Sequence, residues 1–205
     1  MLPVLWSLTF FSLFACLCRL ADNDDVEFPE LEGGCKEVKQ VRATFERLFA
    51  MIRFGTLTFY SGDLLKAYKT FTEALDLFTK LENDKAVGIA NNNLGNTMLT
   101  LYRTMERTGA PSIYGMSREF VIQKGIAYFK SAIDAGEEAI ERINQEEGWS
   151  TNYLVFMQQL SNRYFNRAMF LLTVRDDHPS PREAEYQGMM DLSTCKDMDR
   201  EVVDN

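Results

Sequence analysis

Helical spacing of apolar residues, interrupted by short polar turns, is the feature that most restricts the fold of this chain. Large apolar residues recur at intervals of three and four in residues 38–52, 64–78 and 87–101, with charged and polar residues between them. This spacing is typical of amphipathic helices. The stretches are separated by the turn signals Ser-Gly-Asp at 61–63 and Glu-Asn-Asp at 82–84. Because no strand-like alternation intervenes, the chain is predicted to be all-α.

A large apolar residue followed by glycine occurs twice within these predicted helices. The pairs Phe54-Gly55 and Leu94-Gly95 lie 40 residues apart. Glycine inside a helix costs about 1 kcal/mol relative to alanine, so it usually marks a place where another helix comes close. The two pairs therefore predict a repeated helical hairpin with close contact between its helices.

The first hairpin also carries a small-large-small row on its second helix, Ala67-x3-Phe71-x2-Ala74. With Phe54-Gly55 before it, this row resembles the tetratricopeptide repeat (TPR) pattern. The stretch at 81–97, LENDKAVGIANNNLGNT, is similar to the 40-residue TPR variant of spindle-orientation scaffolds and kinesin light chains. The resemblance implies a TPR-like α-solenoid of antiparallel helical hairpins over residues 35–194, followed by a polar tail at 195–205.

The resemblance weakens after the first helix of the second predicted hairpin. Gly125, Phe129 and Ala132 copy the small-large-small spacing, but 18 extra residues precede them. A loop signal at 108–112 predicts that these residues form a surface excursion. A third hairpin opens near Leu160. It is divergent, because Gly188 stands where a large aromatic residue is expected. We therefore expect about three hairpins, the last atypical.

Residues 1–19 are predicted to be a transmembrane anchor or a signal segment that precedes the repeats as an apolar helix. Residues 1–18 carry no charge, and about 18 residues are at the short end of what spans a bilayer. The absence of a basic start and of a good cleavage site favours a retained anchor. Arg19 favours a cytoplasmic repeat domain. Signal cleavage, giving a secreted or lumenal protein, is the alternative.

Residues 20–34 form an acidic linker in this interpretation. The stretch has six acidic residues, no Lys or Arg, a proline and a Gly-Gly pair, and such composition is typical of extended connecting segments. The sequence therefore predicts a membrane-associated repeat domain on a polar tether.

Charge and motif content exclude several classes of function. The formal net charge is −8, the wrong sign for electrostatic binding of nucleic acid. The only histidine is His178, and the sequence has no phosphate-binding loop, no nucleophile elbow and no Cys-x-x-Cys pair. We therefore expect no catalysis, no cofactor and no metal site.

Stacked hairpins line an inner wall with the first helix of each pair, and such walls bind an extended peptide or a partner helix. The predicted first helices can be aligned on Phe54, Leu94 and Leu160. This alignment places Arg53, Asn93 and Gln159 at equivalent positions, and Asn96 and Asn162 at equivalent positions three residues later. Amides supply both donors and acceptors for a peptide backbone. The resemblance implies ligand contact at Asn92, Asn93 and Asn96. The predicted partner-binding residues are Arg53, Asn92, Asn93, Asn96, Gln159, Asn162 and Asn166.

Two structural alternatives apply to this surface. Asn93 has the residue type that caps or braces a neighbouring helical turn, and solvated polar surface is common on helices. A carboxylate clamp of the kind that binds chaperone tails needs several Lys and Arg, and the aligned positions supply only Arg53. We therefore do not expect a clamp.

The predicted function is a protein-interaction scaffold or adaptor. The alternative is the cytoplasmic TPR portion of a membrane signalling receptor whose sensor or effector lies outside this chain. Three hairpins are near the lower size limit for an independently stable array, which favours self-association or continuation of the array.

Overall fold

The computed structural model describes residues 36–146 and 148–204, with side chains from residue 46 onward. The predicted segments 1–19 and 20–34 lie outside the described residues, so the membrane anchor and the acidic linker stay predictions. Within the described part of the chain, no helix combines the length and apolarity needed to cross a bilayer. The chain divides into two units, residues 1–47 and 48–205. The first described helix crosses the boundary between these ranges, and the later helices belong to the second unit.

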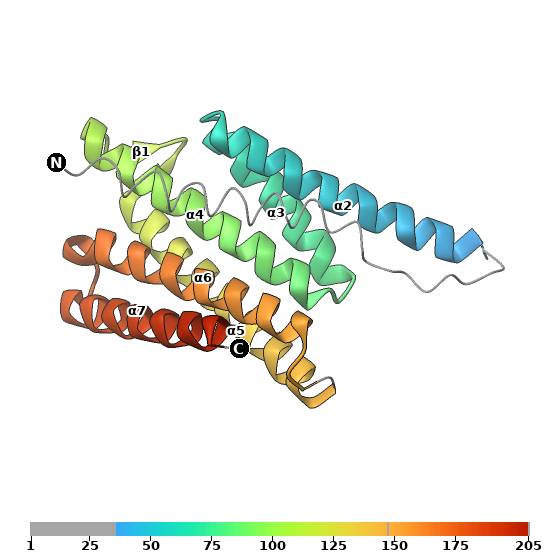
Figure 1. The fold of residues 1–205 in the computed structure, drawn as a ribbon. Coiled ribbons are helices and arrows are strands. Elements are labelled where there is room, and N and C mark those ends of the chain that lie inside the picture. The colour runs from blue at the N-terminus through green and yellow to red at the C-terminus, as the bar shows by residue number, and fades with distance from the viewer. Residues whose placement is uncertain (1–35, 147, 205) are drawn as a thin grey trace. The chain divides into compact units, whose positions relative to one another are not determined.

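The described residues form an all-α, repeat-like fold of antiparallel helix pairs, which confirms the predicted fold class at this level (Figure 1). The helices are α2 (Lys36–Tyr60), α3 (Leu64–Lys80), α4 (Asp84–Thr108), α5 (Arg118–Glu146), α6 (Thr151–Val174) and α7 (Pro181–Val203). A 3-10 turn, η1 (Arg175–Asp177), follows α6, and the two-residue strands β1 (Ser112–Ile113) and β2 (Met116–Ser117) pair antiparallel between α4 and α5. Because α7 reaches Val203, most of the predicted tail at 195–205 is helical.

Local capping ends and starts the helices where the turn signals predict. Gly62 has a φ of +86°, which glycine adopts without strain. The Asp63 carboxylate accepts a hydrogen bond from the backbone N–H of Lys66 at 3.1 Å. The Asn83 side chain accepts one from Ala86 N at 2.9 Å. Each cap satisfies a backbone donor that the first turn of a helix leaves unpaired.

Glycines let phenylalanine rings lie directly against the backbone of a neighbouring helix. A Cβ atom on Gly55 would lie 2.5 Å from Phe71 Cε1, and one on Gly95 would lie 2.7 Å from Phe129 Cε1. Both rings are buried. The prediction that these glycines mark close helix approach is therefore confirmed. The same contact recurs between α5 and α6, where the Phe170 ring occupies the space a Gly125 side chain would need.

The 18 inserted residues are mainly helix, so the predicted surface excursion is smaller than expected. α4 continues for 14 residues after Leu94, whereas α2 continues for six after Phe54. α5 begins seven residues before Gly125, whereas α3 begins three before Ala67. Only residues 109–117 connect the two long helices. The insertion therefore lengthens the second hairpin by several turns and leaves a short β-turn at its tip.

The added turns are stable because their apolar side chains are buried together. Met98, Tyr102 and Met105 of α4 pack with Val121 and Ile122 of α5 in one cluster. These α4 residues continue the spacing of three and four that begins earlier in the helix. The predicted loop begins at Gly109, which ends α4 in the left-handed conformation.

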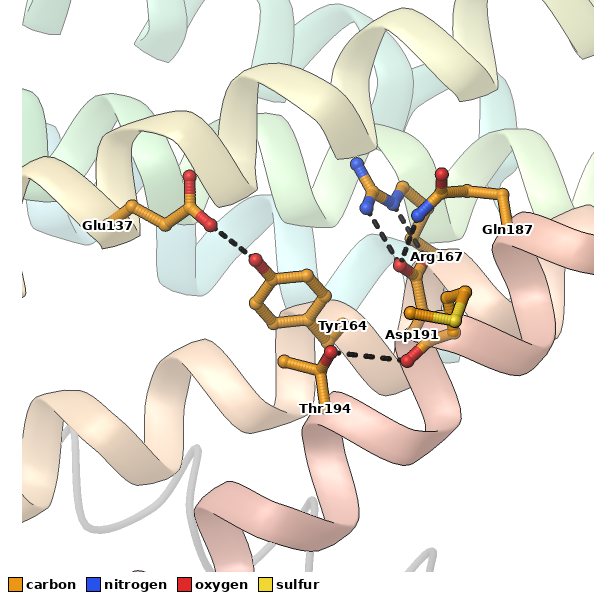
Figure 2. Close-up of polar contacts among 7 residues, drawn as sticks. Glu137, Tyr164, Arg167, Gln187, Asp191 and Thr194 are labelled. Atoms are coloured by element: carbon orange, nitrogen blue, oxygen red, sulfur yellow. Dashed lines mark hydrogen bonds and ion pairs between the residues drawn. The ribbon is translucent and has the colours of Figure 1, made fainter.

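The third pair, α6 and α7, is held by polar contacts where the earlier pairs use an aromatic ring. Arg167 donates from Nε and Nη2 to the Asp191 carboxylate at 2.7 and 2.8 Å. Gln187 Nε2 donates to Asp191 Oδ1 at 2.8 Å. Figure 2 shows both side chains converging on Asp191, with Tyr164 donating to Glu137 of α5 nearby.

Gly188 of α7 explains why the third pair closes without the expected aromatic residue. Its lack of a side chain leaves room for Leu172 of α6.

Replacing Gly95 with alanine should lower the free energy of unfolding by about 1–2 kcal/mol, although alanine is the better helix former by about 1 kcal/mol. The added methyl group has to displace the buried Phe129 ring. Urea unfolding measures this, with Gly188→Ala as control, because its nearest neighbour is the Leu172 side chain at 3.0 Å. Equal stability of Gly95→Ala and the control would contradict the close-contact account.

Asp191→Leu should lower the free energy of unfolding by about 3–5 kcal/mol, because it leaves the Arg167 guanidinium without its carboxylate in a mostly buried site. The double variant Arg167→Met, Asp191→Leu should recover much of this loss, since no charge is then stranded. Thermal and urea unfolding of the single and double variants measure the coupling. A double variant no more stable than the single one would show that the ion pair does not set this interface.

Candidate functional site

The first helices of the second and third pairs, α4 and α6, lie side by side (Figure 1). Several polar side chains contact each other where the two helices meet. We call this line of contact the α4–α6 seam and define it by the residues that contact across it. Lys85 Nζ lies 4.6 Å from the centre of the Phe156 ring. Asn166 Nδ2 donates to Asn92 Oδ1 at 3.1 Å. Further along, Arg103 Nη2 lies 3.5 Å from Thr173 Oγ1.

Helical period explains why polar residues collect at the seam. Lys85, Asn92 and Asn96 are seven and four residues apart, which places them on one face of α4. The apolar residues of α4, such as Leu94 and Met98, are buried in the two cores instead. The matching stripe on α6, at intervals of three and four, consists of Phe156, Gln159, Arg163 and Asn166.

The structure brings some of the predicted binding residues together and separates others. Asn92 and Asn166 are bonded to each other across the seam. Gln159 is buried on α6. Asn96 and Asn162 are partly exposed on α4 and α6. Arg53 is exposed on α2, the first helix of the preceding pair.

The observed contacts differ from the sequence alignment of these helices. Aligning Leu94 with Leu160 places Gln158 opposite Asn92, whereas the structure places Asn166 there, about two turns further along α6. The contact of Phe170 with Gly125 sets this position. Because α6 has no glycine equivalent to Gly95, sequence comparison had no fixed point for the register.

Asn93 has a buried donor with no partner. Its Nδ2 atom is buried and makes no hydrogen bond to any described residue. Its main-chain oxygen accepts from Thr97 Oγ1 at 2.8 Å, as a helical backbone carbonyl commonly does. A buried polar group without a partner is unfavourable by about 1–3 kcal/mol. A bracing role for Asn93 through this donor would need a hydrogen bond that the donor does not make to any described residue.

Arg163 is a buried cation that the sequence-based prediction did not include. Its side chain enters between α4 and α5, where Gly88 and Gly136 leave space, and Nη1 donates to the Ala132 carbonyl at 2.6 Å. Only 6% of the residue is exposed, and burial lowers its pKa to about 10. Among the described residues, no carboxylate forms a salt bridge with it. An arginine within the buried stripe of a helix was the available sequence signal.

Lys85 is the second cation at this end of the seam. Partial burial lowers its pKa, and the positive charge of Arg163 lowers it further. The adjacent Asp84 is engaged elsewhere, with Arg142 Nη2 at 3.1 Å from its Oδ2. The Lys85 and Arg163 pair therefore forms a local positive site.

The other polar clusters contain partnered charges. At the tip of the second hairpin, Tyr102 and Arg118 donate to Asp177 Oδ2 at 2.8 and 2.7 Å. These two hydrogen bonds lower the pKa of the Asp177 carboxyl. This cluster ties α4 and α5 to η1, the turn that follows α6. Because its charges are compensated, it serves packing, in contrast to the seam.

No family model, curated protein or solved structure matches the chain.

Asn93→Leu should leave the free energy of unfolding unchanged or raise it slightly, because leucine keeps the side-chain shape and removes a buried donor that has no partner. Asn166→Ala should lower it by about 1 kcal/mol, because the bond to Asn92 is lost. Urea unfolding of both variants beside the unaltered protein measures the difference. A loss of more than about 1 kcal/mol in Asn93→Leu would show that the Asn93 amide supports the fold.

Proposed function

We propose that this protein is a non-enzymatic interaction module that binds an extended peptide segment of a partner protein along the α4–α6 seam. The observation that carries the proposal is the buried, unpartnered Nδ2 donor of Asn93 next to the Asn92–Asn166 hydrogen bond. A backbone carbonyl of a bound peptide would supply the missing acceptor. The unfavourable free energy of the unbound donor would then be recovered on binding.

The chemistry of the seam supports a peptide over an apolar ligand. Asn and Gln side chains offer a donor and an acceptor each, which matches the alternating N–H and C=O groups of an extended backbone. From Lys85 to Asn96 the helix rises about 16 Å, at about 1.5 Å per residue. This length corresponds to about five residues of extended peptide at about 3.3 Å each.

The TPR resemblance supports the same function. It implies antiparallel hairpins whose first helices line a binding surface, and α4 and α6 are the first helices of the second and third pairs. It further implies ligand contact at Asn92, Asn93 and Asn96, which lie on α4. We therefore keep the scaffold or adaptor function and assign its binding surface to the second and third pairs.

Selection of peptides from a random phage-display library against the full chain tests this proposal. We expect specific binders, and synthetic copies should lose at least about tenfold in affinity with Asn93→Leu and with Asn96→Ala, because each variant removes a backbone contact. Fluorescence anisotropy measures the affinity, and thermal unfolding checks that the variants are folded. Asn144→Ala is the matched control, since Asn144 is exposed on α5.

Two results would contradict the proposal. One is the absence of any binder above the background of an unrelated helical protein. The other is a set of binders whose affinity is the same for the Asn93 and Asn96 variants as for the Asn144 control.

A further inference from the structure

We infer that the seam selects peptide segments that carry a carboxylate, and that Lys85 and Arg163 together receive it. This inference rests on the proposed function and adds the chemical class of the ligand. The sequence-based expectation found only Arg53 at the aligned inner positions and therefore expected no carboxylate clamp of the kind that binds chaperone tails; Lys85 and Arg163 lie outside those aligned positions.

No described carboxylate compensates the charge of Arg163. A buried charge is strongly unfavourable unless it is paired. Arg163 has one hydrogen bond, to a neutral backbone carbonyl, and no salt bridge to a described residue. By contrast, Arg167, four residues later on the same helix, is bonded twice to Asp191. The guanidinium of Arg163 therefore gains more than that of Arg167 from an anion supplied by a ligand.

Lys85 lies at the exposed edge of the same site. The Arg163 guanidinium packs against Gly88, which lies about one helical turn after Lys85 on α4. Two like charges placed in this way are unfavourable, and Arg163 accordingly lowers the pKa of Lys85. An anion between them would remove this repulsion. Lys85 also stays at the Phe156 ring, which positions its ammonium group on the α6 side of the seam.

The sign of this site is opposite to the charge of the whole chain. The formal net charge is −8, so most of the surface repels an acidic ligand. Asp84, the carboxylate nearest to Lys85 in the sequence, is paired with Arg142. A positive site on a negative protein favours correct placement of an acidic segment more than it favours general attraction.

The burial of Arg163 favours a carboxylate as its ligand over a larger anionic polymer. Because Arg163 is only 6% exposed, the ligand group has to be small and carried on a flexible side chain. An Asp or Glu side chain fits this requirement, and its two oxygens can accept from the guanidinium and from the ammonium group at once. The negative charge of the protein disfavours nucleic acid.

The inference is tested with the peptides selected against the full chain and with their matched amide forms. We expect the selected sequences to share at least one Asp or Glu, and its replacement by Asn or Gln to weaken binding at least about tenfold at low salt. In the Lys85→Gln protein the difference in affinity between acidic and amide peptides should shrink by at least about threefold, because only Arg163 then contacts the carboxylate. Lys130→Gln makes the same change of net charge on α5, where Lys130 pairs with Asp134, and should keep the full difference.

Arg163 is tested by Arg163→Lys and Arg163→Gln, each checked for folding by thermal unfolding. The lysine variant should bind acidic peptide more tightly than the glutamine variant. If either fails to fold, the Lys85 comparison still decides the question, because Lys85 is at the surface.

The outcomes separate the two proposals. Selected peptides without shared acidic residues, which lose affinity in Asn93→Leu and keep it in Lys85→Gln, would overturn the carboxylate inference and leave the proposed function standing. Failure to select any peptide would overturn the proposed function itself.

Discussion

The arrangement of the helices depends on glycines that let phenylalanine rings contact the backbone of a neighbouring helix. Gly55 with Phe71 and Gly95 with Phe129 close the first two pairs, and Gly125 with Phe170 joins the second pair to the third. A methyl group at these glycines would overlap the rings. These contacts tolerate little change in the distance between helices. They therefore determine which helices are neighbours and how each helix is positioned along the axis of its neighbour.

The polar seam follows from these apolar contacts. Once Phe170 is seated at Gly125, the preceding turns of α6 run along α4 and place Asn166 against Asn92 and Phe156 against Lys85. Arg163 then enters between Gly88 and Gly136. The apolar clusters stabilise the fold, so the seam can keep an amide donor without a hydrogen-bond partner and a guanidinium without a carboxylate among the described residues. Both would be unfavourable in a core built only for stability. The apolar clusters hold the helices together and the polar residues of the seam are not needed for that purpose, which supports a binding role for the seam.

Local signals in the sequence predicted the helices and their ends, because caps and turns act over a few residues. Ser-Gly-Asp at 61–63 and Asn83 are examples. The 18-residue insertion was misjudged because Gly109 and Pro111 indicated a loop, although Met98, Tyr102 and Met105 continue the helical spacing. Arg163 was missed for a different reason. Its place depends on Gly88, Ala132 and Gly136, which are 27 to 75 residues away in the sequence, and no local pattern reports such contacts.

The central claim is that recognition occurs on the α4–α6 seam, and site-specific photo-crosslinking tests it most directly. A photoreactive amino acid would replace Thr100, a partly exposed residue of α4 one helical turn after Asn96, in one protein and Tyr186, an exposed residue of α7, in another. The account predicts that a selected peptide is crosslinked at position 100 and not at position 186. Efficient crosslinking at 186 with none at 100 would contradict it, because binding would then lie on a surface that the seam does not include.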